Sequence, residues 1–168
     1  VTLGAPSLEQ TIEGMEGEIQ KRFMHHYIMS INPFATGVVK RIGSPIRRDI
    51  GHGALVELAL ESVIPSEDDF PYAIRVVSEV LAANASTSMG SLCASTLALL
   101  NAGVPLVEPV AGIALGLLSN DKKFQVITDM RAVEDFYGEM VRQKMLGQSD
   151  SPTPSQVCRI TAQVFSSL

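Results

Sequence analysis

A strand followed directly by a helix, over residues 72–101, is the feature that most constrains how this chain folds. Residues 72–81 alternate, with Ile74, Val76 and Val80 on one face. A period of two residues predicts a half-buried strand, and the segment that follows has the period of a helix up to about Asn101. A strand that leads into a helix is typical of folds in which sheet and helices pack on one another.

The predicted helix has a hydroxyl-rich start and a well-marked end. Ser86, Thr87 or Ser88 can cap it, because a side-chain oxygen satisfies one of the free backbone N–H groups at a helix N-terminus. Gly103 is placed as the C-terminal stop, with Pro105 beyond it. The predicted buried stripe consists of Met89, Leu92, Cys93, Thr96, Leu97 and Leu100.

Other segments predict further strands and one further helix. The predicted strands are residues 18–29, 107–118, 124–128 and, as a weak edge, 157–164. Prolines and glycines predict a long loop over residues 30–46, and a helix is expected from Ala54 to about Val63. Residues 141–156 show no clear period.

Length and composition indicate one globular domain. The chain has 168 residues, of which 46% are hydrophobic, and a mean hydropathy of +0.21. No apolar run reaches the length that spans a membrane. Cys93 and Cys158 do not have the spacing of a metal site, so the pair fits a reducing compartment better than a disulfide scaffold. The first four residues resemble the inside of a strand, and we expect the chain to begin partway through a longer protein.

Positive charge is concentrated in one short segment. The net charge is −5, which argues weakly against a general nucleic-acid binder. The distribution of charge matters more than its sum, however, and four basic residues lie within nine positions with no acidic residue between them. They are Lys40, Arg41, Arg47 and Arg48.

The arginine pair and the hydroxyl cluster together predict a site for a phosphate group. A helix N-terminus offers backbone N–H groups and the positive end of the helix dipole, and Ser86, Thr87 and Ser88 add hydroxyl donors there. Arg47 and Arg48 can each grip a phosphate through two parallel N–H bonds. The alternative is that the serines only cap a helix and the arginines are solvated. On spacing alone this structural alternative is favoured.

Six short motifs in order carry a resemblance to a known family. They are residues 22–27 (RFMHHY), 47–55 (RRDIGHGAL), 63–67 (VIPSE), 70–76 (FPYAIRV), 86–89 (STSM) and 102–105 (AGVP). Together they closely resemble the second catalytic-core domain of the polynucleotide phosphorylase family, an RNase PH-type domain. The resemblance runs from Val1 to about Met140, so residues 1–140 are interpreted as a partial RNase PH-like domain and 141–168 as a divergent tail.

The resemblance implies an α+β fold, a mixed sheet with packed helices in two layers, and an enzyme that degrades RNA by phosphorolysis. Inorganic phosphate attacks the 3′-terminal phosphodiester and releases a nucleoside diphosphate. By position, Arg47, Arg48 and His52 match residues that contact RNA and phosphate, with His52 also a candidate catalytic residue. Ser86, Thr87 and Ser88 match the phosphate-binding loop. RNA and further copies of the chain, in a ring-forming trimer, are the implied partners.

A divalent metal, Mg²⁺ or Mn²⁺, is also implied, and this chain departs from the family in that region. Asp135 stands at a catalytic, metal-binding position, and Glu139 is a carboxylate where the pattern has aspartate. Val141 replaces the second metal-binding aspartate, and a valine cannot bind a hard cation. Gln143 replaces a lysine, which removes a positive charge from the reacting phosphates.

Two functions follow from these observations. The first is a phosphorolytic 3′-to-5′ exoribonuclease, or polyribonucleotide nucleotidyltransferase. The second is a non-catalytic RNA-binding or ring-scaffold subunit that has lost the metal site. The resemblance implies an intracellular protein, and bacterial cytoplasm, mitochondrion and plastid all fit. His25 and His26 are not expected to share a metal ion, because adjacent residues of a strand point to opposite faces.

Overall fold

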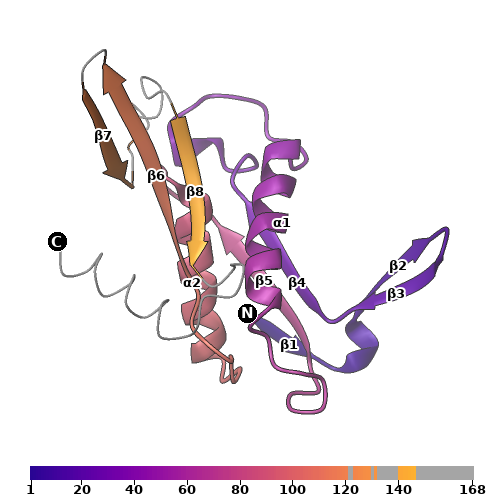
Figure 1. The fold of residues 1–168 in the computed structure, drawn as a ribbon. Coiled ribbons are helices and arrows are strands. Elements are labelled where there is room, and N and C mark those ends of the chain that lie inside the picture. Colours follow the sequence, from indigo (N-terminus) through magenta and orange to yellow (C-terminus); the bar gives the residue numbers. More distant parts are fainter. Residues whose placement is uncertain (121–122, 130, 132–139, 147–168) are drawn as a thin grey trace.

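The computed structural model describes residues 1–120, 123–129, 131 and 140–146 (Figure 1). Its strands are β1 (Thr2–Gly4), β2 (Gln10–Gly14), β3 (Gly17–Lys21), β4 (Phe23–Ile28), β5 (Ala73–Glu79), β6 (Ala111–Asn120), β7 (Lys123–Thr128) and β8 (Met140–Leu146). Its α-helices are α1 (Arg47–Glu61) and α2 (Thr87–Asn101), and two 3-10 turns lie at Pro6–Leu8 and Pro33–Thr36. The expected α+β fold with a mixed sheet and packed helices is confirmed.

The first sheet places the starts of both helices at one edge. Its order is β1-β5-β4, with β4 and β5 parallel and β1 antiparallel to β5. Because β4 leads into α1 and β5 leads into α2, both helix N-termini follow the carboxyl ends of neighbouring parallel strands. Ligands bind in the crevice at this edge in open sheets that carry helices.

Helix α1 begins earlier than the sequence predicted. The expected start was Ala54, after two glycines, but the helix starts at Arg47. The carboxylate of Asp49, the third residue of the helix, accepts a hydrogen bond from the backbone N–H of Ile46 at 3.3 Å. This is one half of a capping box, and it stabilises a first turn that glycine content alone argued against. The two arginines therefore lie on a helix, not on the loop before it.

Helix α2 has the predicted limits but a different buried face. Gly103 has φ +80° directly after it, as expected of a stop residue. Met89, Leu92 and Thr96 are buried, whereas Leu97 and Leu100, predicted to be buried, are 67% and 47% exposed. Serines face the sheet instead. They are Ser88, Ser91 and Ser95, each at most 4% exposed.

Polar partners explain why serines occupy this face. Ser91 Oγ donates to Ser78 Oγ of β5 at 2.6 Å, and Ser95 Oγ lies 3.2 Å from His25 Nε2 of β4. Burial of a hydroxyl costs little free energy once the hydroxyl is hydrogen-bonded. A hydropathy pattern does not show whether such a partner lies opposite.

A second sheet, in the order β7-β6-β8, packs on the other side of α2 (Figure 1). A Cβ at Gly112 of β6 would lie 2.6 Å from Met89 Sδ and 3.0 Å from Leu92 Cδ2, so a larger residue at position 112 would force these side chains of α2 to shift. The strand predicted from residue 107 begins at Ala111, since prolines at 105 and 109 lack the N–H that pairing requires. Strand β8, antiparallel to β6, was missed by the sequence analysis.

The segment predicted as one strand, residues 18–29, is divided at Arg22. Residues 17–21 form β3, whose one partner strand within the described ranges is β2, in a hairpin that projects from the body of the molecule (Figure 1). Ile19 is consequently 67% exposed, whereas Phe23 and Tyr27 of β4 are buried. Residues 157–164 lie outside the described part of the chain. Among the described helices, none combines the length and apolar character needed to cross a membrane.

Candidate functional site

The candidate site lies where the two helix N-termini meet above a small apolar cluster. This cluster consists of Tyr27, Ala35 and Val80, with Met29 and Ala83 packed against it. It is separate from the main core between the helices and the sheets. The backbone N–H of Ala83 donates to the carbonyl of Ala35 at 2.8 Å, so the loop before α1 and the loop before α2 are joined directly.

Arg47 and Arg48 are exposed on the first turn of α1, and the residue after them anchors that turn. Asp49 is 3% exposed. Its carboxylate accepts hydrogen bonds from the backbone N–H of Ser30, at 3.3 Å, and from the Ser30 hydroxyl, as well as from Ile46. Asp49 thus ties the start of α1 to the end of β4. The two arginines, both exposed, therefore lie on a turn that Asp49 anchors.

His52 lies one turn further along α1 and is half-buried against Tyr27, with ring centroids 5.5 Å apart. Burial lowers the pKa of His52, the positive charge of Arg48 lowers it further, and Asp49 opposes both effects. The imidazole is therefore mostly neutral at pH 7. It can donate or accept a hydrogen bond with a ligand, but it adds little positive charge to that of the arginines.

Tyr27 connects this part of the site to the start of α2. Its hydroxyl lies 2.5 Å from Thr87 Oγ1, and both hydroxyls approach the sulfur of Met29, at 3.2 Å and 3.5 Å. Burial raises the pKa of Tyr27, and its hydrogen bond to Thr87 opposes the rise. One buried side chain of β4 thus contacts His52 on α1 and Thr87 on α2.

The three predicted hydroxyls have different surroundings. Ser86 is the N-cap residue of α2, but its side chain makes no capping hydrogen bond; its Oγ lies 3.4 Å from Ser88 Oγ. Ser86 and Thr87 are half-buried, and Ser88 is fully buried. Gly90 is exposed, and a Cβ there would meet no atom within 4 Å, so the approach to this helix start is open. Of the three, Thr87 is the residue whose hydroxyl connects the start of α2 to Tyr27 of β4.

His25, on the same strand as Tyr27, is buried away from the site. It is 6% exposed, and its Nε2 lies near Ser95. Burial lowers the pKa of His25 to about 4, although the negative charge of Glu57 opposes this. His26 is exposed, so the two histidines point to opposite faces of the strand, as expected.

The free energy of unfolding should therefore fall as the pH drops below about 6.5. The unfolded chain binds a proton at His25 near pH 6.5, while the folded chain resists it until about pH 4. The expected loss by pH 4 is about 2–3 kcal/mol, and no loss from this residue is expected above pH 6.5. Urea unfolding at several pH values measures it. His25→Gln should flatten the curve relative to the matched variant His26→Gln; parallel curves for the two variants would contradict this assignment.

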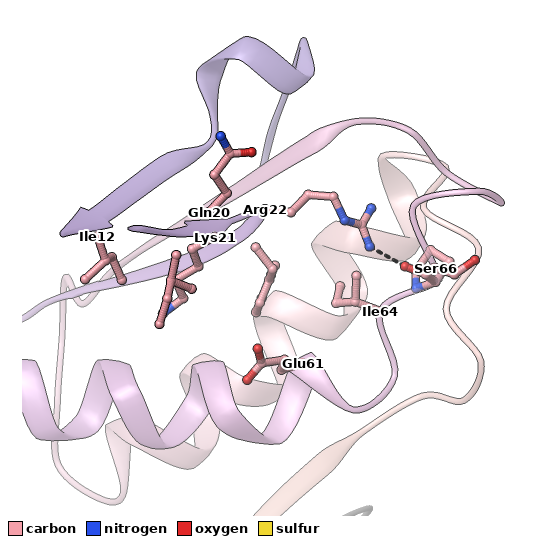
Figure 2. Close-up of a pocket in the computed structure, with 10 residues that line it drawn as sticks. Ile12, Gln20, Lys21, Arg22, Glu61, Ile64 and Ser66 are labelled. Carbon is pink, nitrogen blue, oxygen red and sulfur yellow. Dashed lines mark hydrogen bonds between the residues drawn. The ribbon is translucent and has the colours of Figure 1, made fainter. Parts of the chain in front are cut away.

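A pocket of about 470 Å³ lies at the opposite end of α1, beside β3 and residues 64–66 (Figure 2). Its basic side chains are already engaged. Arg22 donates to the carbonyls of Phe70, at 2.7 Å, and Pro65, and Lys21 pairs with Glu57. Since α1 has 15 residues, the pocket is about 20 Å along the helix from the arginine pair. This pocket is not the predicted anion site.

Comparison with known proteins decides the family. Residues 1–105 match the model of the 3′ exoribonuclease family, domain 1, which is more than half of the chain. The chain belongs to the 3′ exoribonuclease family. The resemblance inferred from the six motifs is confirmed.

Curated relatives named polyribonucleotide nucleotidyltransferase resemble this family member over most of its length. The protein of Halothermothrix orenii is 56% identical over 140 residues, which is 83% of this chain and 20% of that protein. The protein of Desulforamulus reducens is 51% identical over 168 residues, 98% of this chain and 22% of that protein. The chain thus spans about a fifth of the length of these relatives.

A solved structure, that of rice (Oryza sativa) Rrp46, supports the fold. Its TM-score is 0.53 at 18% identity, and the match covers 64% of this chain and 49% of that one. At this identity the likeness concerns the fold alone. It agrees with the mixed sheet and packed helices of the RNase PH-type domain.

The predicted metal-binding residues of this family member, Asp135 and Glu139, lie outside the described residues. Among the residues that are described, no three His, Cys, Asp or Glu side chains gather into a group that could hold a metal ion. In the pairing of β8 with β6, Val141 is opposite Gly116 and Gln143 is opposite Ala114.

Sequence reasoning missed two residues of this site. Tyr27 looked like an ordinary core residue of a strand, and its hydroxyl partner lies 60 positions away. Asp49 stood within the motif RRDIGHGAL, and no role was predicted for it. The capping-box spacing, with a carboxylate three residues after a helix N-cap, was the signal that could have identified Asp49.

Proposed function

We propose that this chain is the phosphate- and RNA-binding part of a phosphorolytic 3′-to-5′ exoribonuclease, a polyribonucleotide nucleotidyltransferase. The observation that carries the proposal is the meeting of two helix N-termini at one sheet edge. One brings exposed Arg47 and Arg48, the other brings Thr87, and Tyr27 joins them. The curated relatives carry the name of this activity.

In the proposed reaction, an oxygen of inorganic phosphate attacks the phosphorus of the last phosphodiester of RNA. The bond from that phosphorus to the 3′ oxygen of the preceding nucleotide breaks, so the shortened RNA keeps this oxygen and a nucleoside diphosphate leaves. Two anions must be brought together, and positioning and neutralisation of charge are the main tasks of the protein.

The described residues suit these tasks. Arg47 and Arg48 carry positive charge, and each guanidinium can grip a phosphate through two parallel N–H bonds. They neutralise the RNA phosphates or the attacking phosphate. Neutral His52, which packs against Tyr27 one turn along α1 from the arginines, can donate or accept a hydrogen bond with the terminal nucleotide. Ser86, Thr87 and the N-terminus of α2 hold the second anion.

A divalent metal, Mg²⁺ or Mn²⁺, would be held by Asp135, with Glu139 beside it in the sequence. When bound, such a metal neutralises charge on the reacting phosphates. Val141 and Gln143 stand where the family has a second carboxylate and a lysine, and they favour a second candidate function. In this candidate the chain binds RNA, or holds a ring of subunits together, without catalysis.

Release of nucleoside diphosphate separates the two functions. Incubation of the chain with poly(A), inorganic phosphate and Mg²⁺ is expected to yield ADP, measured by chromatography, and Asp135→Ala is expected to reduce the rate by at least about 100-fold. The matched control Asp68→Ala changes an exposed carboxylate in a turn and should leave the rate unchanged. RNA binding that weakens with salt, without any ADP, would identify the non-catalytic function instead.

We further infer an intracellular site of action and assembly into a ring-forming trimer. RNA is the partner that the basic turn of α1 suits, and the family resemblance supports the ring. Sedimentation of the purified chain measures the assembly directly. A species of three chains is expected, and a monomer at micromolar concentration would contradict this part of the proposal.

A further inference from the structure

Tyr27 makes contacts that a purely structural residue of the core does not need. It is 5% exposed, yet its hydroxyl lies at the base of the site, 2.5 Å from Thr87 Oγ1. Its ring is held by His52. A phenylalanine would fill the same space within the small apolar cluster, so the hydroxyl itself calls for an explanation.

The role of the Tyr27 hydroxyl follows from the number of protons that it and the Thr87 hydroxyl can donate. Each of the two hydroxyls, on Tyr27 and Thr87, has one proton to donate. Phosphate offers acceptors, so Thr87 helps to bind it only if the Thr87 proton points to the anion. If Thr87 donated to Tyr27 instead, its lone pairs would face the phosphate and repel it. The direction of the hydrogen bond between the two residues therefore decides whether Thr87 can bind phosphate.

We propose that Tyr27 is a positioning residue for inorganic phosphate: it donates its proton to Thr87 Oγ1 and so directs the Thr87 proton to the anion. The proposal rests on the proposed function, since it presumes that the start of α2 binds phosphate. In this arrangement a residue of strand β4 controls the direction in which a hydroxyl at the start of helix α2 points. No direct contact between Tyr27 and the ligand is involved.

The surroundings of the pair support this arrangement. Both hydroxyls approach the sulfur of Met29, at 3.2 Å and 3.5 Å, and a thioether is a weak acceptor. The Thr87 proton can leave the sulfur for an anion at small cost. Burial also raises the pKa of Tyr27, so the phenol keeps its proton throughout the working pH range. The packing against His52 limits rotation of the ring.

The variant Tyr27→Phe tests the proposal, because it removes one oxygen and keeps the ring. Binding of inorganic phosphate, followed by ³¹P NMR or calorimetry, is expected to weaken about tenfold. Binding of poly(A), which uses the arginines, should change by less than twofold. Where ADP release is measurable, KM for phosphate should rise and KM for poly(A) should not. The matched control Tyr72→Phe removes the hydroxyl of an exposed tyrosine and should alter neither.

A double-mutant cycle shows whether Tyr27 acts through Thr87. With Thr87→Val already present, Tyr27→Phe should have no further effect on phosphate binding, whereas with the conservative Thr87→Ser the full effect of Tyr27→Phe should remain. Additive losses in the cycle would overturn the proposal, as would normal phosphate binding by Tyr27→Phe. If the unchanged chain binds no phosphate, the proposed function fails and this inference fails with it. Thermal unfolding shows whether the variants keep their fold; a loss of poly(A) binding in step with lower stability would assign Tyr27 a structural role.

Discussion

Replacement of both Arg47 and Arg48 by alanine is expected to weaken binding of poly(A) by about 10- to 100-fold at low salt. Both side chains are exposed on the first turn of α1, so their removal leaves no cavity and no buried partner without a hydrogen bond. The loss should come from phosphate contacts. The plot of log affinity against log salt concentration should therefore become shallower by about 1.4, since each contact to single-stranded RNA contributes about 0.7.

The position of the charge, not its total, is what this experiment must isolate. Arg75→Ala removes one exposed arginine from the middle of β5, and each single variant at 47 or 48 removes one charge as well. Fluorescence anisotropy with labelled poly(A) should show a loss for the single variants at 47 and 48 and almost none for Arg75→Ala. Equal small losses at all three positions would mean that only net charge matters, and the RNA site would have to be placed elsewhere.

The part of the site that charge and hydroxyl patterns reveal was predictable from the sequence. The clustering of Arg47 and Arg48 and the run from Ser86 to Ser88 are visible without coordinates. The edge that brings them together follows from two parallel strands, each leading into a helix. What the sequence lacked was the start of α1, because Gly51 and Gly53 argued against a helix there and the capping by Asp49 is a contact, not a pattern.

Contacts between distant residues account for the other differences. The serine face of α2 could not be predicted from hydropathy, since Ser91 and Ser95 are buried only because Ser78 and His25 lie opposite them. Strand β8 has a mixed composition, and its conformation follows from its pairing with β6. The same holds for Tyr27, whose role depends on a threonine 60 positions away. Local periodicity identified the elements, while partners across the sheet determined their faces and their limits.

Among the residues of the site, Asp49, with its buried carboxylate, should contribute most to the free energy of unfolding. Asp49→Ala is expected to lower the free energy of unfolding by about 2–4 kcal/mol, because the N–H groups of Ser30 and Ile46 and the hydroxyl of Ser30 lose a shared acceptor that is only 3% exposed. Urea unfolding at pH 7 measures the loss. Asp68→Ala, which changes an exposed carboxylate, should stay within about 0.5 kcal/mol of the unchanged chain.

Whether Asp49→Ala strengthens or weakens the binding of RNA distinguishes two roles for Asp49. The variant removes a negative charge next to Arg48, so charge alone would strengthen the binding of poly(A). If Asp49 instead holds the first turn of α1 in place, its loss lets that turn fray and the arginines lose their fixed positions, which weakens binding. We expect weaker binding, by about threefold to tenfold, at a temperature where the variant remains folded. Tighter binding would show that the arginines act as freely moving charges, and the ordered turn that ties α1 to β4 would then serve stability alone.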